Sequence, residues 1–346
     1  NMKRFLSFIL ALTLAVSLVP SAFAASDEAV QAANALHTLG LFNGTGTDAN
    51  GNPVYDLERT PTRAEAVTML VRLLGKEEEA EKNVWTTPFT DVADWAKPYV
   101  GYAYNNGLTS GISATIFGTN NDVTASQYIT FALRALGYES GKDFKWDSSW
   151  KLADSIGLTN GEYTNNTCKF TRGEAAFISL LTLTCNLKNS DEPLFSKIQE
   201  SGDIGENVSF SAPRKLKYTY CNDQGDAMNY ENEYIKDATV ARIGELYLFK
   251  FTLIPKYFLR AYFFPSGYQG DIAGYSKKIS IFSSKNADIS TFLVTNEFIY
   301  RNPINQTSMV FDLRPNLTSF PENFKFAEGC IDKCIIVDIK TADLPK

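Results

Sequence analysis

Hydrophobic and polar positions follow two different periods along the chain, and the change falls near residue 190. Before it, apolar residues recur every three or four positions, as in Val67, Leu70, Val71 and Leu74, which places them on one face of an α-helix. After it, short runs rich in aromatic and β-branched residues are separated by turn signals, a pattern typical of β-strands. The pattern predicts an α + β multidomain chain, with helices first and a β-rich part afterwards.

The helical part contains three copies of one plan. In each copy a helix ends in Gly-Leu, a loop of variable length follows, and a second helix begins at a threonine. One such unit cannot bury its apolar stripe alone, so we expect the three copies to share a helical core. The copies cover about residues 28–75, 89–138 and 144–188.

The second helix of each copy begins with a capping box, in which a threonine is followed three residues later by Glu or Gln. The two side chains satisfy exposed backbone N–H groups at the start of a helix. We therefore expect the acidic members to act as caps and not as ligands. The three pairs are Thr62 with Glu65, Thr124 with Gln127, and Thr171 with Glu174.

Several motifs in these copies resemble the S-layer homology (SLH) family at the family's spacing. They are Phe89-x-Asp91-Val92, Trp95-Ala96, Asn106-Gly107-Leu108 and the TRxE motifs at residues 62–65 and 171–174. The resemblance covers roughly residues 28–188, although the first copy lacks the Phe-x-Asp opening. It implies a pseudo-threefold helical spindle that binds secondary cell-wall polysaccharide, often pyruvylated, in grooves between repeats.

The same resemblance implies which residues contact the polysaccharide. The arginines of the TRxE motifs, Arg63 and Arg172, are the expected carboxylate contacts, and Asp91, Trp95 and Trp150 are expected to line the grooves. A pyruvyl ketal carries a carboxylate, which the planar guanidinium matches with two parallel hydrogen bonds. The alternatives are that the arginines are solvated surface residues and that Trp95 and Tyr99 belong to the core. The second copy has Ala125 in place of the arginine, so its groove should be weak or lost.

The N-terminal residues predict export. A positive segment, Met2-Lys3-Arg4, precedes an apolar run over residues 5–19, and Ala22-Phe23-Ala24 fits a small-x-small cleavage site. This is the pattern of a secretory signal peptide comprising residues 1–24. The alternative is a membrane anchor, for which the run is short. Together with the SLH resemblance, the signal predicts a secreted protein held at the cell wall, in the S-layer of a Gram-positive-type bacterium.

The remaining chain divides into three further parts. We expect the SLH repeats at 26–188, a linker at 189–206 and a β-rich domain of sandwich or barrel type at 207–346. The two domains are expected to fold independently. The expected strands lie at 216–220, 238–243, 246–254, 258–264, 278–282, 291–295, 298–301, 308–313 and 334–339.

Charge and residue types exclude several classes of function. The net charge of −6 and the lack of a basic block argue against a nucleic-acid partner. Because His37 is the only histidine, Ser-His-Asp catalysis and zinc hydrolysis are improbable, and no metal or cofactor is expected. The residue types do not exclude a glycan hydrolase that uses a pair of carboxylates, for which Glu231 and Glu233 are the candidates. The five cysteines are odd in number, so they cannot all pair within the chain.

Three functions remain from the sequence. The leading one is non-covalent anchoring to the wall by carbohydrate binding, with the β-rich domain displayed as a binding or interaction module for a glycan or protein. The second is a structural component of the S-layer, and the third is a wall-anchored glycan hydrolase. The sequence leaves open the ligand of residues 207–346, the chemistry of the wall polymer and the oligomeric state.

Overall fold

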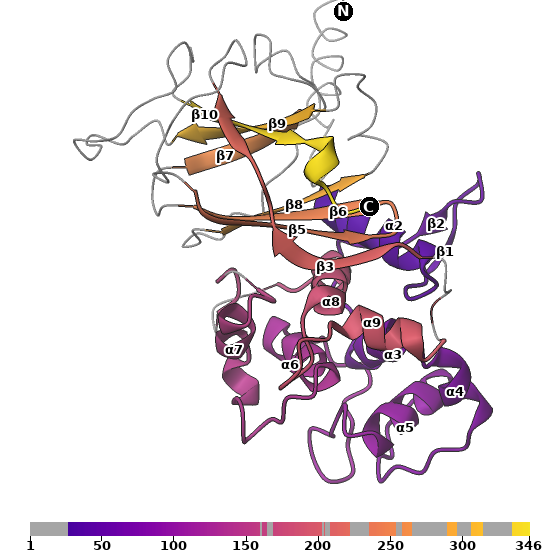
Figure 1. Cartoon of the computed structure of the whole chain (residues 1–346). Helices are drawn as coiled ribbons and strands as arrows, with labels where there is room; N and C mark the ends of the chain where they lie inside the picture. The colour runs from indigo at the N-terminus through magenta and orange to yellow at the C-terminus, as the bar shows by residue number, and fades with distance from the viewer. Residues whose placement is uncertain are drawn as a thin grey trace, which may run out of the picture.

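A computed structural model describes residues 27–159, 161–164, 169–202, 204, 208–221, 235–253, 258–264, 289–295, 306–313 and 334–346. The predicted signal peptide lies outside these residues. The chain is α + β, with helices in its first half and antiparallel sheets in its second (Figure 1). Among the described residues, no helix has the length and apolar character needed to cross a membrane.

The helical part consists of short helices joined by loops. The first loop carries a two-stranded ribbon, β1 (Gly46–Thr47) with β2 (Pro53–Val54), and the short 3-10 turns η1 (Asp94–Ala96) and η2 (Trp146–Ser148) precede two of the helices. The helices are α2 (Asp27–Thr38), α3 (Arg63–Leu73), α4 (Glu77–Lys82), α5 (Lys97–Asn105), α6 (Ala125–Ala135), α7 (Trp150–Ser155), α8 (Arg172–Thr184) and α9 (Leu194–Glu200).

Helices α3, α6 and α8 form the centre of the helical part. Each begins with a capping box in which the threonine accepts from the backbone of the third residue and the Glu or Gln accepts from the threonine backbone. The three helices contact one another and are mostly buried. The first helix of each copy packs against the capped helix of another copy: α5 against α3, α7 against α6, and α2 against α8. The first and last copies are therefore in contact.

Loops of one copy hydrogen-bond to the start of a capped helix in another. The Arg63 N–H donates to the carbonyl of Asn121 at 2.8 Å, and the Arg172 N–H donates to the carbonyl of Arg59 at 2.9 Å. The first four N–H groups of an α-helix have no partner within the helix, so these loops satisfy donors that would otherwise be buried without one. As a result, Arg63 and Arg172 each lie at a contact between two copies.

The β-rich part contains two four-stranded antiparallel sheets. One has the order β3-β5-β6-β8 and the other β4-β10-β9-β7. Figure 1 shows the first sheet next to the helices and the second beyond it. The strands are β3 (Phe210–Lys215), β4 (Thr219–Cys221), β5 (Ile235–Ile243), β6 (Leu246–Leu253), β7 (Phe258–Phe264), β8 (Ile289–Thr295), β9 (Gln306–Leu313) and β10 (Cys334–Lys340), followed by the turn η4 (Thr341–Asp343).

Two of the predicted strands, 278–282 and 298–301, lie outside the described residues. Strand β3 was absent from the prediction because Phe-Ser-Ala-Pro-Arg-Lys lacks the apolar alternation of a half-buried strand. It lies at the edge of its sheet, where a proline is tolerated.

The junction between the two parts differs from the predicted linker at 189–206. This segment contains α9, whose Leu194, Phe195 and Ile198 are buried. The ring of Phe195 stacks on Phe210 of β3, with centroids 4.4 Å apart. The apolar residues of α9 are too few for their spacing to stand out, and acidic and glycine residues flank them. The helical core continues through this contact into residues of β5 and β6.

Candidate ligand-binding groove

A cavity of about 300 Å³ lies where the first two copies meet the start of the third. Its walls come from the start of α3, the loop after α5, one face of α6, and η2. None of the described residues that line it is acidic. They are Arg63, Ser110, Gly111, Ile112, Gln127, Thr130, Phe131, Arg134, Ser140 and Trp146.

Arg63 is the innermost cation of this cavity. Its side chain is buried, and its Nη2 donates to the carbonyl of Ser110 at 2.7 Å. The guanidinium also lies over the rings of Phe117 and Phe131, 5.0 Å and 5.3 Å from their centroids. Its Nε is buried and has no hydrogen-bond partner. The side chain thus keeps a buried donor without a hydrogen-bond partner among the described residues.

A second arginine, Arg134 on α6, lies beside the first. One of its nitrogens donates to the carbonyl of Leu108 at 3.4 Å. Burial and, to a lesser extent, the charge of Arg134 together lower the pKa of Arg63 to about 10. Burial also lowers the pKa of Arg134. Both groups remain cationic at neutral pH, so two positive charges share a cavity that offers no described carboxylate. An anion would relieve both the desolvation and the repulsion.

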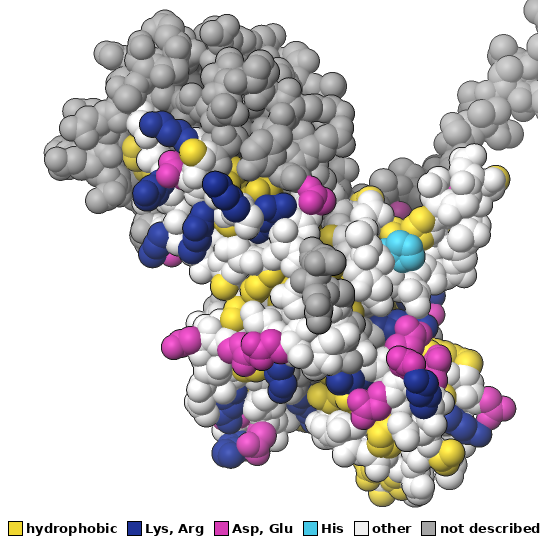
Figure 2. Space-filling view, turned by 45° about the vertical axis from the view of Figure 1, so that its right-hand side comes forward, with side chains coloured by type: hydrophobic (Ala, Val, Ile, Leu, Met, Phe, Trp, Pro, Cys, Tyr) yellow, Lys and Arg dark blue, Asp and Glu magenta, His cyan; other side chains and the backbone are white. Residues whose placement is uncertain are grey.

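The mouth of the cavity carries exposed apolar surface. Trp146, at the start of η2, is 60% exposed, and Ile112 in the opposite loop is also exposed. The flat face of an indole can pack against a sugar ring while its edge remains in water. Elsewhere on the helical part, acidic and basic side chains are interspersed over the face shown in Figure 2. Binding to a polyanion would therefore depend on a few placed cations.

The second predicted arginine, Arg172, lies in a different environment. Its Nε donates to the carbonyl of Tyr55 at 2.8 Å, and its guanidinium lies over the ring of Phe42. The neighbouring Arg59 donates two hydrogen bonds to Glu65, at 2.5 Å and 2.8 Å. Here the chain itself supplies acceptors, so the site has less positive charge to offer a ligand than the cavity at Arg63.

The same contrast holds for Arg72 and Arg134, which each follow their capping threonine by ten residues. Arg72 on α3 is ion-paired with Glu77, at 2.7 Å. Glu77 also accepts a hydrogen bond from the Tyr99 hydroxyl at 3.0 Å. Among the described residues, Arg134 has no such carboxylate. Two arginines at equivalent positions therefore differ in charge compensation.

Asp91 has a structural role that the sequence did not predict. Its carboxylate accepts from the backbone N–H groups of Phe117, Gly118 and Thr119, at 2.7, 2.7 and 3.2 Å. Burial by itself would raise the pKa of Asp91, but these donors outweigh burial and lower it. The carboxylate thus holds the loop of the second copy, which includes the ring of Phe117 beneath Arg63.

The two predicted tryptophans differ from each other. Trp95 lies in η1 and is 52% exposed. The turn η1 contacts α3, and the turn η2 contacts α6 in the same way. Trp150 is only 9% exposed and belongs to the core, so it does not line the cavity. The exposed tryptophan of the third copy is Trp146, four residues earlier. Sequence reasoning missed Trp146 and Arg134 as site residues. Arg134 could have been found because it follows its capping threonine by ten residues, as Arg72 does.

Known proteins similar to this chain are bacterial surface proteins. A middle cell wall protein of Brevibacillus brevis is 32% identical over half of this chain and 17% of its own length. A surface layer protein of Brevibacillus choshinensis is 30% identical over 60% of the chain and 18% of its own length. A cell surface protein of Thermoanaerobacter kivui is 26% identical over 70% of the chain and 31% of its own length.

The chain spans less than a third of the length of each of these three relatives. Glycanases match shorter stretches, covering a quarter and about a third of the chain. No family model matches it. The similarities are consistent with the SLH resemblance of the helical part and indicate a location at the cell surface. The chain is thus a relative of bacterial surface-layer and cell-wall proteins.

Proposed function

We propose that the helical part anchors the protein to the cell wall by binding an anionic secondary polysaccharide in the cavity at Arg63. The observation that carries this proposal is the pairing of the buried Arg63 with the partly buried Arg134 in a cavity without a described carboxylate. A pyruvylated sugar fits this chemistry, because the two arginine charges attract its carboxylate while its ring packs on Trp146. The names of the relatives support a role at the wall.

The proposal includes the finer architecture that the SLH resemblance implies. The cyclic contacts of α2 with α8, α5 with α3, and α7 with α6 support a pseudo-threefold spindle. The two facing sheets of the β-rich part support a sandwich, which would be displayed from the wall as a binding module. A cleaved signal peptide at residues 1–24 would deliver the chain to the outside of the cell.

Arg63 and Arg134 carry the binding in this proposal. Arg172 holds the loop of the first copy and contributes less, because its surroundings already contain acceptors. Asp91 supports the loop under Arg63 and does not contact the sugar. In the second copy, Ala125 occupies the position of Arg63 and Arg172 and offers no guanidinium. We therefore expect a single groove to account for most of the binding.

Co-sedimentation of the full chain with purified cell-wall sacculi tests the proposal, before and after the secondary polysaccharide is stripped. We expect binding before stripping and none after it. Arg134→Gln should weaken binding at least tenfold, because a charge-assisted hydrogen bond contributes about 1.5–3 kcal/mol. The matched control is Arg72→Gln, whose arginine is at the equivalent position but paired with Glu77. Equal binding to stripped sacculi would contradict the polysaccharide as ligand, and equal binding by the Arg134 variant would contradict the site.

A structural role in the surface layer is the second candidate, favoured by the similarity to surface layer proteins. It predicts that the purified chain forms ordered sheets by itself. Electron microscopy of the protein alone, and of protein bound to sacculi, separates self-assembly from anchoring. A hydrolase function has no support from the described residues, and Glu231 and Glu233 lie outside them.

A further inference from the structure

The three capping boxes differ in charge at the third residue of the helix. The first and third copies have a glutamate there, Glu65 and Glu174, whereas the second copy has Gln127. Glutamate and glutamine cap a helix in the same way, because a single side-chain oxygen accepts from the threonine N–H. The capping of α6 therefore does not require that this residue be neutral.

The neutral cap is the one that faces the groove. Gln127 is among the residues that line the cavity at Arg63, and the glutamates of the other two caps do not line it. A carboxylate at position 127 would share the cavity with Arg63 and Arg134. It would act as an internal counter-ion for two charges that are otherwise uncompensated by the described lining.

The first copy shows what a glutamate does at this position. Glu65 accepts from the Thr62 N–H through Oε2 at 2.8 Å, and its Oε1 accepts from Arg59 at 2.5 Å. One oxygen thus caps the helix while the other pairs with an arginine of the chain itself. That arginine is compensated within the fold and has less charge to offer a ligand.

The amide of Gln127 presents a donor in place of this second oxygen. Its Oε1 accepts from the Thr124 N–H at 3.3 Å, so the cap determines which end of the amide is the oxygen. The other end is Nε2, which carries two N–H donors. Gln127 is partly exposed, and in the part of the chain that the structure describes its Nε2 donates to no other residue.

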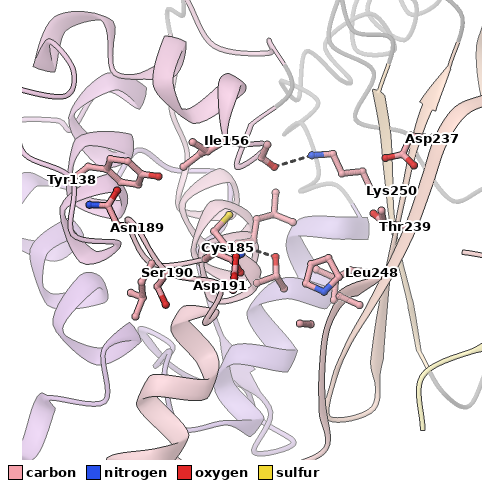
Figure 3. Close-up of a pocket in the computed structure, with 18 residues that line it drawn as sticks. Tyr138, Ile156, Cys185, Asn189, Ser190, Asp191, Asp237, Thr239, Leu248 and Lys250 are labelled. Atoms are coloured by element: carbon pink, nitrogen blue, oxygen red, sulfur yellow. Dashed lines mark hydrogen bonds between the residues drawn. The ribbon is translucent and has the colours of Figure 1, made fainter. Parts of the chain in front are cut away.

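A lining without carboxylates is not a general property of cavities in this chain. A larger cavity, of about 850 Å³, lies between the end of the helical part and the β3-β5-β6-β8 sheet (Figure 3). Asp191 and Asp237 line it together with Lys250, whose Nζ donates to the carbonyl of Gly157 at 2.8 Å. Its described lining thus carries two carboxylates against one ammonium group, and it has no excess of positive charge.

We propose that Gln127 determines the specificity of the groove at Arg63 for an anionic sugar. This inference rests on the proposed function of that groove. The neutral cap leaves the charges of Arg63 and Arg134 to a ligand carboxylate, and Nε2 adds a donor for the same ligand. A glutamate at position 127 would keep the start of α6 and repel the anion.

The variant Gln127→Glu separates capping from charge, because glutamate already caps two helices of this chain. In co-sedimentation with sacculi that retain the secondary polysaccharide, it should bind about tenfold or more weakly than the parent protein, since its carboxylate competes with the ligand for the two arginines. Its Tm should equal or exceed that of the parent protein, because the carboxylate relieves the repulsion between Arg63 and Arg134. A residue that only caps the helix would not lose binding while stability is kept.

Two matched controls should bind like the parent protein. Glu174→Gln makes the reverse exchange in the third capping box, and Asn120→Asp adds a negative charge at an exposed residue of the second copy that does not line the cavity. If Asn120→Asp weakens binding as much as Gln127→Glu, net charge and not position accounts for the loss, and the inference is overturned.

The remaining outcomes separate this inference from the function on which it rests. If the parent protein does not bind sacculi, or binds stripped sacculi equally, the proposed function of the groove is wrong and the role of Gln127 falls with it. If the parent protein requires the polysaccharide but Gln127→Glu binds as tightly, Gln127 is only a cap and this inference alone is overturned. A Tm of Gln127→Glu below that of the parent protein would also contradict the argument from charge.

Discussion

Replacing Arg63 by glutamine should weaken wall binding while leaving the stability of the fold almost unchanged. The pKa of Arg63 falls from its ordinary 12.5 to about 10. Because one pKa unit corresponds to about 1.4 kcal/mol, holding this cation in the cavity costs about 3 kcal/mol. The hydrogen bond to Ser110 offsets about 1.5–3 kcal/mol of that cost, and contacts with two aromatic rings offset about 0.5–1 kcal/mol each.

The favourable and unfavourable contributions are therefore nearly equal. We expect Arg63→Gln to change the free energy of unfolding by no more than about 1 kcal/mol. It also removes a positive charge that we propose attracts the ligand carboxylate, so a loss of about 2 kcal/mol of binding energy should raise the dissociation constant about thirtyfold. An arginine kept where it adds little stability is expected at a binding site.

Arg172→Gln should show the opposite behaviour. It removes the hydrogen bond from Nε to the Tyr55 carbonyl and leaves that buried acceptor unpaired, which costs about 1–3 kcal/mol. Urea denaturation followed by far-UV circular dichroism gives the stability, and co-sedimentation with sacculi at graded protein concentrations gives the affinity. The reasoning is refuted if Arg63→Gln binds like the parent protein, or if it loses more than about 3 kcal/mol of stability.

Three further outcomes are expected. Phe195→Ala should destabilise the protein by about 3–5 kcal/mol in urea denaturation, because Phe195 is fully buried against Phe210 where the two parts meet; a loss below about 1 kcal/mol would show that this contact does not couple them. Cys185 should resist iodoacetamide at pH 8 in the native protein and react after unfolding, since burial raises its pKa to about 12; peptide mass mapping measures this, and rapid native labelling would contradict it. The pKa of Asp91 is lowered in the fold, so its anion stabilises the protein above its ordinary pKa of 3.8, and this stability is lost as pH falls through the folded value. Asp91→Asn should therefore lower Tm at pH 7 and make Tm less sensitive to pH below about 4. Thermal unfolding at a series of pH values measures this. If Tm of the variant falls with acid as steeply as Tm of the parent protein, the carboxylate does not hold its loop.

The sequence determined the features whose partners are close in the chain. The capping boxes at Thr62, Thr124 and Thr171 needed only a Glu or Gln three residues away, and each is present. The glycines predicted to end the first helices, Gly40 and Gly107, have positive φ angles of 73° and 71°, which only glycine adopts without strain. The order of helices and then strands followed in the same way from local periodicity.

The tertiary structure decided which polar groups are free and which are used within the fold. Arg72 and Arg134 are equivalent in the sequence, but only Arg72 lies against a described carboxylate. Asp91 was expected to line a groove, and instead its oxygens accept from donors 26 to 28 residues away. Lys250 reaches a carbonyl 93 residues distant. The availability of a charge to a ligand depends on the acceptors around it, and packing brings those acceptors together from distant parts of the chain.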